Sequence, residues 1–230
     1  MSAKELFSTP LFSDANLQGY YRFESNGNDS KNSNNLTLTG SPTYSAGKFN
    51  NGIVTVSGKH GTVNAFEYVT SFTWMMWVNI RVGAAFDQAA VGKNKADLSV
   101  ARKISFSNGG SPTTQFWTPA IGITGLSAGG AVAGETITSG VTNFIAGIYD
   151  ATNTVCKIWV NGNKYQTTNT GTPTASPDVF NVGRASAADS TFDGNIDDLA
   201  IFNRALTDVE ILKYFNGDWT KSSLFLYNLI

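Results

Sequence analysis

The sequence is poor in the residue types on which much enzyme chemistry depends. Its 230 residues include one cysteine, Cys156, and one histidine, His60. A single cysteine excludes an internal disulfide, and we expect Cys156 to be a small, buried side chain in a strand. Nucleophilic triads usually need an imidazole base. Because His60 lies in a segment that predicts a turn, Ser57-Gly-Lys-His-Gly-Thr, the sequence argues against such a triad.

Charge and long apolar runs are also scarce. Charged residues make up 14% of the chain, and the formal net charge is −1, so nothing predicts steering toward nucleic acid. No apolar run reaches the roughly 18 residues that would span a bilayer, and we expect no membrane insertion. No secretory signal is visible at the N-terminus. We expect the protein at an extracellular surface or in a virion.

Turn residues and short strand-like runs dominate the chain. There are 23 glycines, and the apolar runs recur at short spacing with turn residues between them. The clearest hairpin has Asn161-Gly162 between Val155–Val160 and Lys164–Thr168. Such a pattern predicts an all-β sandwich of two antiparallel sheets. The expected strands are 17–24, 35–39, 52–56, 62–69, 71–80, 88–92, 98–106, 114–118, 131–137, 143–149, 154–160, 179–183 and 192–203.

The last of these strands carries alternating polar residues. Asp193, Asn195 and Asp197 recur at every second position, which predicts one shared strand face. Leu199 and Ile201 continue the same parity. The alternation therefore predicts that Asp197 lies on the core-facing side of the strand.

One helical turn is predicted after this strand. Thr207 stands three residues before Glu210, which is the spacing of a capping box. Gly217 is placed to end the helix.

Several segments together resemble laminin-G-like domains of the concanavalin A-like lectin/glucanase superfamily. They are the closing stretch Phe192 to Ile211, Gly19-Tyr-Tyr-Arg-Phe-Glu-Ser, Gly47-Lys-Phe-Asn-Asn-Gly-Ile, Phe72-Thr-Trp-Met-Met-Trp-Val, Ala146-Gly-Ile-Tyr-Asp and Lys157-Ile-Trp-Val-Asn-Gly. The resemblance implies a concanavalin A-like jelly roll with one short C-terminal helical turn. We expect an N-terminal arm (1–16), a β-sandwich domain (17–217) and an apolar C-terminal tail (218–230).

The same resemblance implies a non-catalytic recognition module. Glycosidases of this superfamily carry a Glu-x-Asp-x-x-Glu motif, which is absent here, and Asp193 to Asp197 has no adjacent Glu to act as acid or nucleophile. We therefore expect no enzymatic activity and no catalytic residue, with glycoside hydrolysis a distant third hypothesis. The leading expectation is a lectin-like module that binds glycan or a protein surface.

A structural calcium ion is the cofactor that the resemblance suggests. In related jelly rolls a calcium ion ties the first strand to an acid of the last strand. Glu24, which is expected to end the first strand, and Asp197 match those positions, and main-chain oxygens near Gly52 would complete the shell. An acid on a core-facing parity needs a cation or several donors. Hydrogen bonds from loop amides are the alternative for Asp197.

Sugar binding needs an aromatic platform. Trp74, Trp77 and Trp159 lie in dense strand patterns and are expected in the core. Trp117 has no periodic partners and is the best prediction for an exposed platform, with Tyr68 the weaker one.

The apolar ends of the chain support a rival function. Leu6, Phe7, Leu11 and Phe12 in the arm and Leu224-Phe-Leu-Tyr-Asn-Leu-Ile in the tail are apolar enough to dock on a surface. They could pack within the chain or on a neighbour. We expect a homo-oligomer or part of a larger assembly. The rival is thus a structural subunit of a virion or surface assembly, such as a capsid decoration, tail or fibre component.

Overall fold

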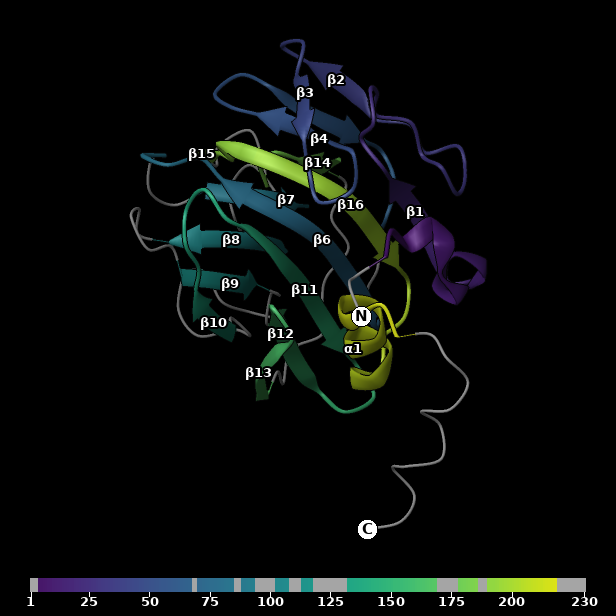
Figure 1. Cartoon of the computed structure of the whole chain (residues 1–230). Helices are drawn as coiled ribbons and strands as arrows, with labels where there is room; N and C mark the ends of the chain where they lie inside the picture. Colours follow the sequence, from purple (N-terminus) through teal and green to yellow (C-terminus); the bar gives the residue numbers. More distant parts are fainter. Residues whose placement is uncertain are drawn as a thin grey trace.

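The computed structural model describes residues 4–67, 70–84, 88–93, 102–107, 113–117, 132–168, 178–185 and 190–218. Within them the chain forms two eight-stranded sheets that pack face to face, with one helix near the C-terminal end (Figure 1). The neighbouring strands are antiparallel except for β15, which runs parallel to β7. The predicted jelly-roll sandwich is therefore confirmed.

Sheet A carries the longest strands. Its central strands are β6 and β16, and β1 pairs with the second half of β16, beyond the residues that β4 pairs. The order is β13 (Asn163–Thr168), β12 (Val155–Val160), β11 (Thr142–Asp150), β6 (Phe72–Ile80), β16 (Gly194–Phe202), β4 (Asn51–Thr55) and β3 (Thr43–Ala46), with β1 (Leu17–Tyr21) beside β16.

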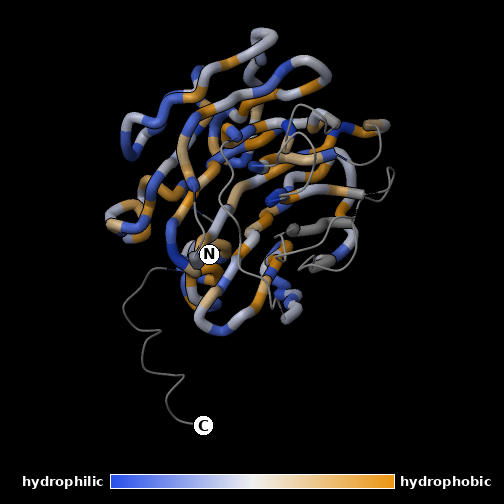
Figure 2. The backbone as a smooth tube through the Cα atoms, turned by 180° about the vertical axis from the view of Figure 1, so that it is seen from behind, coloured by the Kyte–Doolittle hydropathy of each residue, from blue (hydrophilic) through white to orange (hydrophobic). Residues whose placement is uncertain are grey.

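Sheet B lies behind sheet A in Figure 1. The order is β10 (Val132–Thr136), β9 (Thr113–Trp117), β8 (Lys103–Ser107), β7 (Gln88–Gly92), β14 (Phe180–Val182), β5 (His60–Val63) and β2 (Thr37–Thr39), with β15 (Ser190–Thr191) beside β7. Figure 2 shows apolar and polar colours changing along the strands, as expected where one face of a strand is buried.

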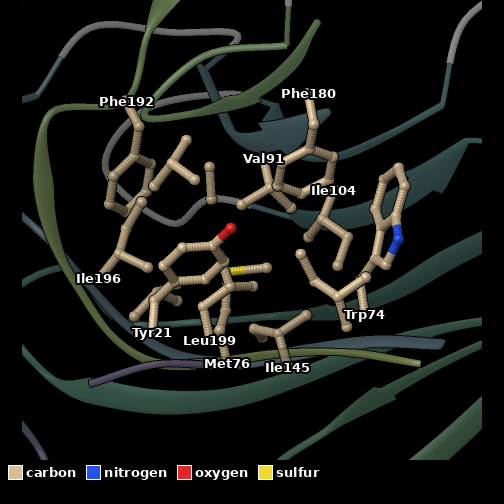
Figure 3. Packing of buried hydrophobic residues seen from close by; sticks show 14 of the residues in the cluster. Tyr21, Trp74, Met76, Val91, Ile104, Ile145, Phe180, Phe192, Ile196 and Leu199 are labelled. Atoms are coloured by element: carbon tan, nitrogen blue, oxygen red, sulfur yellow. The ribbon is translucent and has the colours of Figure 1, made fainter. Parts of the chain in front are cut away.

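The main core fills the space between the two sheets. Trp74 and Met76 of sheet A point toward Val91, Ile104 and Phe180 of sheet B (Figure 3). Trp74 is fully buried there, as the sequence predicted. Its ring meets Phe180 edge-on at 5.2 Å between centroids, a favourable aromatic geometry.

A second core covers the outer face of sheet A. Trp77 and Trp159, both predicted as core, are buried in it. Helix α1 (Asp208–Asn216) contributes Ile211 and Tyr214 to this second core. The outer face of sheet A is therefore closed by the chain itself.

The N-terminal arm packs on the same second core. It forms two short 3₁₀ helices, η1 (Leu6–Ser8) and η2 (Pro10–Ser13). Leu6 and Leu11 are buried within the chain, while Phe7 remains 55% exposed. The arm thus docks on its own domain, and the predicted tail lies outside the described residues beyond Asp218.

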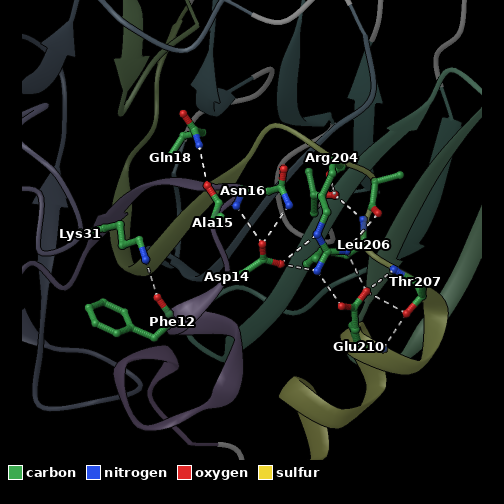
Figure 4. A network of polar contacts seen from close by, with 12 residues as sticks. Phe12, Asp14, Ala15, Asn16, Gln18, Lys31, Arg204, Leu206, Thr207 and Glu210 are labelled. Carbon is green, nitrogen blue, oxygen red and sulfur yellow. Dashed lines mark hydrogen bonds and ion pairs between the residues drawn. The ribbon is translucent and has the colours of Figure 1, made fainter.

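Arg204 ties the arm to helix α1 (Figure 4). Its guanidinium donates from Nε to Asp14 at 2.9 Å and from Nη1 to Glu210 at 3.0 Å. Thr207 and Glu210 then form the predicted capping box, and Gly217 ends the helix in the left-handed conformation.

Replacing Thr207 by Ala is expected to lower the free energy of unfolding by about 1 kcal/mol. The Thr207 hydroxyl accepts from the Glu210 amide at 3.2 Å, and alanine leaves that amide without its cap. Urea unfolding of the two proteins measures the difference. Thr207→Ser is the control, since serine keeps the hydroxyl. Equal losses in both variants would contradict the role of the cap.

Candidate functional site

Two adjacent acids of β16 lie between the part of the strand that pairs with β4 and the part that pairs with β1. β4 pairs with β16 up to Ile196, and β1 pairs with it from Leu199 onward. Asp197 and Asp198, between these points, are each 1% exposed. A β-bulge interrupts the register here, and Asp198 has φ +52.

The bulge corrects the predicted orientation of Asp197. Ile196 and Leu199 both belong to the core between the sheets, whereas Asp197 pairs with Trp77 of the outer core. The extra residue reverses the alternation. Asp197 therefore lies on the outer side of sheet A, not on the parity of Leu199.

The β3–β4 turn covers Asp197. The Phe49 amide donates to Asp197 Oδ2 at 2.8 Å, and the amides of Lys48 and Asp198 also bond the carboxylate. Burial nevertheless raises the pKa of Asp197 to about 8. A side chain at Gly47 would place its Cβ 2.6 Å from Asp197 Oδ2, so this close approach requires glycine.

Glu24 bonds the same turn. It lies beyond the end of β1, which stops at Tyr21, so the prediction that it ends the first strand was wrong. The Asn51 amide donates to Glu24 Oε2 at 3.2 Å, and the Asn50 side chain donates to Oε1 at 3.1 Å. The two predicted calcium ligands thus accept hydrogen bonds from backbone amides only two residues apart in one turn, Phe49 for Asp197 and Asn51 for Glu24.

Asp197 and Glu24 supply carboxylate oxygens of the kind that a hard cation takes. Those oxygens already accept from N–H groups of the turn, and Glu24 also accepts from Arg22 Nη2 at 3.4 Å. Asp197 has hydrogen bonds from loop amides, which was the sequence alternative, but it has no ion-pair partner in the described part of the chain. Calcium takes six to eight oxygen ligands. Within the described residues there is no group of three or more His, Cys, Asp or Glu side chains for a metal. Calcium here would therefore need Asp197, Glu24 and main-chain oxygens of the turn.

Asp198 is the centre of a buried network that the sequence did not reveal. The hydroxyls of Tyr20 and Tyr214 both donate to its carboxylate, and the Leu6 amide donates to Oδ2 at 3.2 Å. Trp77 Nε1 donates to the Tyr214 hydroxyl at 3.1 Å. Burial raises the pKa of Asp198 to about 7. The network joins the arm, β1, β16 and α1.

The remaining polar residues of the closing strand have structural partners. Asp193 pairs with Arg81, and the Asn195 side chain donates to Ser45 O at 3.2 Å. The alternating polar residues Asp193, Asn195 and Asp197 therefore hold loops and strands of sheet A together through hydrogen bonds and an ion pair.

The sequence predicted a turn at His60, and this prediction is wrong. His60 begins β5, where it is 7% exposed, and it pairs with Thr39 of β2. Gly61 approaches Leu36 and Leu38 on the core side. Because strand residues alternate, His60 lies on the outer face of sheet B.

The two predicted aromatic platforms are only partly located. Trp117 is the last residue of β9 in sheet B, where its backbone pairs with Lys103. Its side chain lies outside the described part of the structure, as does Tyr68.

Among the described helices none is long and apolar enough to cross a membrane.

The chain shares its fold with several domains of known structure. Domain 4 of an extracellular GH43 arabinanase from Geobacillus stearothermophilus, solved with arabinotriose, has a TM-score of 0.65 and 18% identity. The match covers 86% of this chain and 98% of that domain.

Toxin binding domains show the same fold over part of their length. The binding domain of Paraclostridial Mosquitocidal Protein 1 has a TM-score of 0.65 and 16% identity, with 88% of this chain and 52% of that one covered. The receptor-binding domain of botulinum neurotoxin type G has a TM-score of 0.63 and 15% identity. The match covers 87% of this chain and 51% of that one. The chain therefore spans about half of each toxin domain.

The sequence itself identifies the family. Among curated proteins, no sequence matches this chain significantly. The laminin G model described as "Concanavalin A-like lectin/glucanases superfamily" matches residues 62–212, more than half of the chain. The matched region runs from β5 to helix α1. The chain belongs to the concanavalin A-like lectin/glucanases superfamily.

Proposed function

We propose that this protein is a non-catalytic, lectin-like module that binds carbohydrate. The observation that carries the proposal is the likeness to the arabinanase domain solved with arabinotriose, which extends over 98% of that domain. At 18% identity the likeness establishes the fold, and function depends on the residues of a site. A second neighbour, the binding domain of botulinum neurotoxin DC, was solved in complex with SialylT.

Sheet B is the face that we propose for the ligand. The outer face of sheet A is occupied by helix α1 and the arm, which bury Leu6, Leu11 and Ile211 against it. Among the described helices none covers sheet B. Trp117 belongs to a strand of sheet B, and we propose it as the stacking platform for a sugar ring. Tyr68 is the second proposed platform.

We also propose that the β3–β4 turn binds calcium as a structural ion, through Asp197 and Glu24. The support is that Asp197 and Glu24 both contact this turn, and that Asp197 is a buried carboxylate without a positive partner among the described residues. The ion would add positive charge where burial opposes the ionised acid. Its role would be to fix the turn against β16.

Removing the platform is expected to weaken glycan binding. Trp117→Ala should lower the response on a glycan array and weaken the affinity for a confirmed sugar roughly tenfold, since stacking contributes on the order of 1–2 kcal/mol. Isothermal titration with the strongest array hit measures the loss. Phe7→Ala is the matched control, because Phe7 is an exposed aromatic on the arm over sheet A.

The control also tests the choice of face. If Phe7→Ala loses binding and Trp117→Ala does not, the ligand is on the arm side and sheet B is the wrong surface. If the parent protein binds no glycan and sediments as an assembly, the rival function as a structural subunit is favoured.

A further inference from the structure

A short segment after β14 folds back over the outer face of sheet B. The Asn181 side chain donates to Val179 O at 2.9 Å and to Ala185 O at 3.2 Å. In turn, Arg184 Nε donates to Asn181 Oδ1 at 3.1 Å. Asn181 is 2% exposed. These bonds hold the Arg184 side chain in a defined place on the sheet.

Arg184 differs from the other arginines of the chain. The other four each pair with a carboxylate: Arg22 with Glu5, Arg81 with Asp193, Arg102 with Glu67, and Arg204 with Asp14 and Glu210. Arg184 has no acidic partner among the described residues, and its hydrogen bond there is the one to Asn181. It is half-buried, and burial lowers its pKa. Partial burial of a guanidinium without an anionic partner, as found here among the described residues, is unfavourable.

The single histidine lies on the same face of sheet B, two residues from Thr62, whose partner Asn181 bonds Arg184. His60 is 7% exposed, and its Nδ1 is buried without a hydrogen-bond partner. Burial and the charge of Arg184 both lower the pKa of His60. Arg184 is the charged group that acts on the imidazole in the described structure. The site therefore has two adjacent polar groups with unused hydrogen-bonding capacity.

Hydroxyl groups border the two side chains. Thr62 pairs with Asn181 across β5 and β14, and Thr37 and Thr39 of β2 pair with Thr62 and His60. Thr37 and Thr39 are exposed, so this side of the site is open to solvent. Leu38 packs toward the core between the sheets, which leaves its neighbours on the outer face.

We propose that this cluster is a subsite for the carboxylate of an acidic saccharide. The planar guanidinium of Arg184 matches a carboxylate in two parallel hydrogen bonds. His60 and the threonines provide hydrogen bonds to the sugar hydroxyls. The inference rests on the proposed lectin function and adds the class of sugar, a uronate or another carboxylate-bearing residue.

Because His60 is the only histidine, its imidazole signals report on the subsite directly. Sodium glucuronate is titrated into the protein while NMR monitors the signals of the His60 ring, and saturable binding is expected. The bound carboxylate should raise the pKa of His60, since it offsets the charge of Arg184. The methyl ester of glucuronate, which lacks the charge, should leave that pKa unchanged. Acetate should bind several-fold more weakly than glucuronate, because it has no hydroxyls.

Arg184→Gln is expected to weaken glucuronate at least about tenfold. Glutamine keeps an N–H that can reach Asn181, and thermal unfolding checks that the variant is folded. Arg81→Gln is the matched control, since it removes an arginine that is already paired with Asp193. It should bind glucuronate as the parent does.

The outcomes separate this subsite from the proposed function. The subsite is rejected if His60 does not respond to glucuronate, if acetate or the ester binds equally well, or if Arg184→Gln binds unchanged. The lectin function survives that result when a neutral glycan binds and Trp117→Ala loses it. A glucuronate response that depends on Arg184 supports the subsite even where the array is silent.

Discussion

Without calcium, the free energy of unfolding is expected to fall as the pH rises from about 4 to about 8. Burial raises the pKa of Asp197 to about 8 and that of Asp198 to about 7, from an ordinary value of 3.8. The unfolded chain releases these protons near pH 4, while the folded protein keeps them until pH 7 or 8. Rising pH therefore favours the unfolded state over this interval.

The expected loss is large for a single domain. For Asp198 alone, the gap between 3.8 and about 7 corresponds to roughly 4 kcal/mol. Asp197 and Asp198 repel each other when both are ionised, so their losses do not simply add. Asp14, Asp208 and Glu210 have lowered pKa values, and their contributions are lost at pH values below their ordinary range. Maximal stability is thus expected in mild acid.

Calcium should reverse the loss that comes from Asp197. The ion binds the ionised carboxylate, so it stabilises the protein more at about pH 8 than at about pH 5. Thermal unfolding in EDTA and in millimolar calcium at both pH values measures this. Asp197→Asn should remove the calcium-dependent rise in melting temperature. The calcium proposal fails if the parent gains no stability from calcium at either pH.

Two local signals in the sequence predict the structure correctly. The Asn161-Gly162 turn joins β12 to β13 with φ values of 50 and 87, because only such residues suit a tight hairpin of this hand. The capping box at Thr207 and Glu210 follows from spacing alone. Both features lie within a few residues, where propensity and geometry suffice.

Features that depend on distant residues were missed. A two-residue period cannot show the extra residue of the β16 bulge, so Asp197 was assigned to the wrong face. The Asp198 network joins Tyr20, 178 positions away, to Tyr214. Strand β3, whose residues are mostly exposed, has no apolar alternation to mark it. Arg184 and His60 likewise come to the same face only after sheet B is assembled.

Asp198→Leu is expected to be among the most destabilising single substitutions in this protein, at about 4 kcal/mol. Leucine leaves the hydroxyls of Tyr20 and Tyr214 and the Leu6 amide without their acceptor, and each buried unsatisfied group costs about 1–3 kcal/mol. The left-handed backbone at Asp198 adds about 1 kcal/mol for a side chain that cannot bond locally. Urea unfolding at about pH 5 measures the total.

Asp198→Asn is the matched variant, because asparagine tolerates the left-handed conformation and still offers an acceptor to the network. It should cost less than Asp198→Leu at about pH 5. At about pH 8 it should be neutral or stabilising relative to the parent, since it removes a buried charge. Its stability should also fall less steeply between these pH values than that of the parent.

The comparison of the two variants separates hydrogen bonding from charge at this position. Leucine removes both acceptor oxygens and the ionisable group, whereas asparagine removes the ionisation and keeps one acceptor oxygen. If the network acts through its hydrogen bonds, the leucine variant should loosen both elements that meet at Asp198, the arm through Leu6 and helix α1 through Tyr214. Faster proteolysis of the arm in Asp198→Leu than in Asp198→Asn would then follow. Equal proteolysis and equal unfolding energies would mean that Asp198 does not hold the outer core together. In that case Arg204, which bonds Asp14 and Glu210 on the surface of the same junction, would remain the main tie between arm and helix.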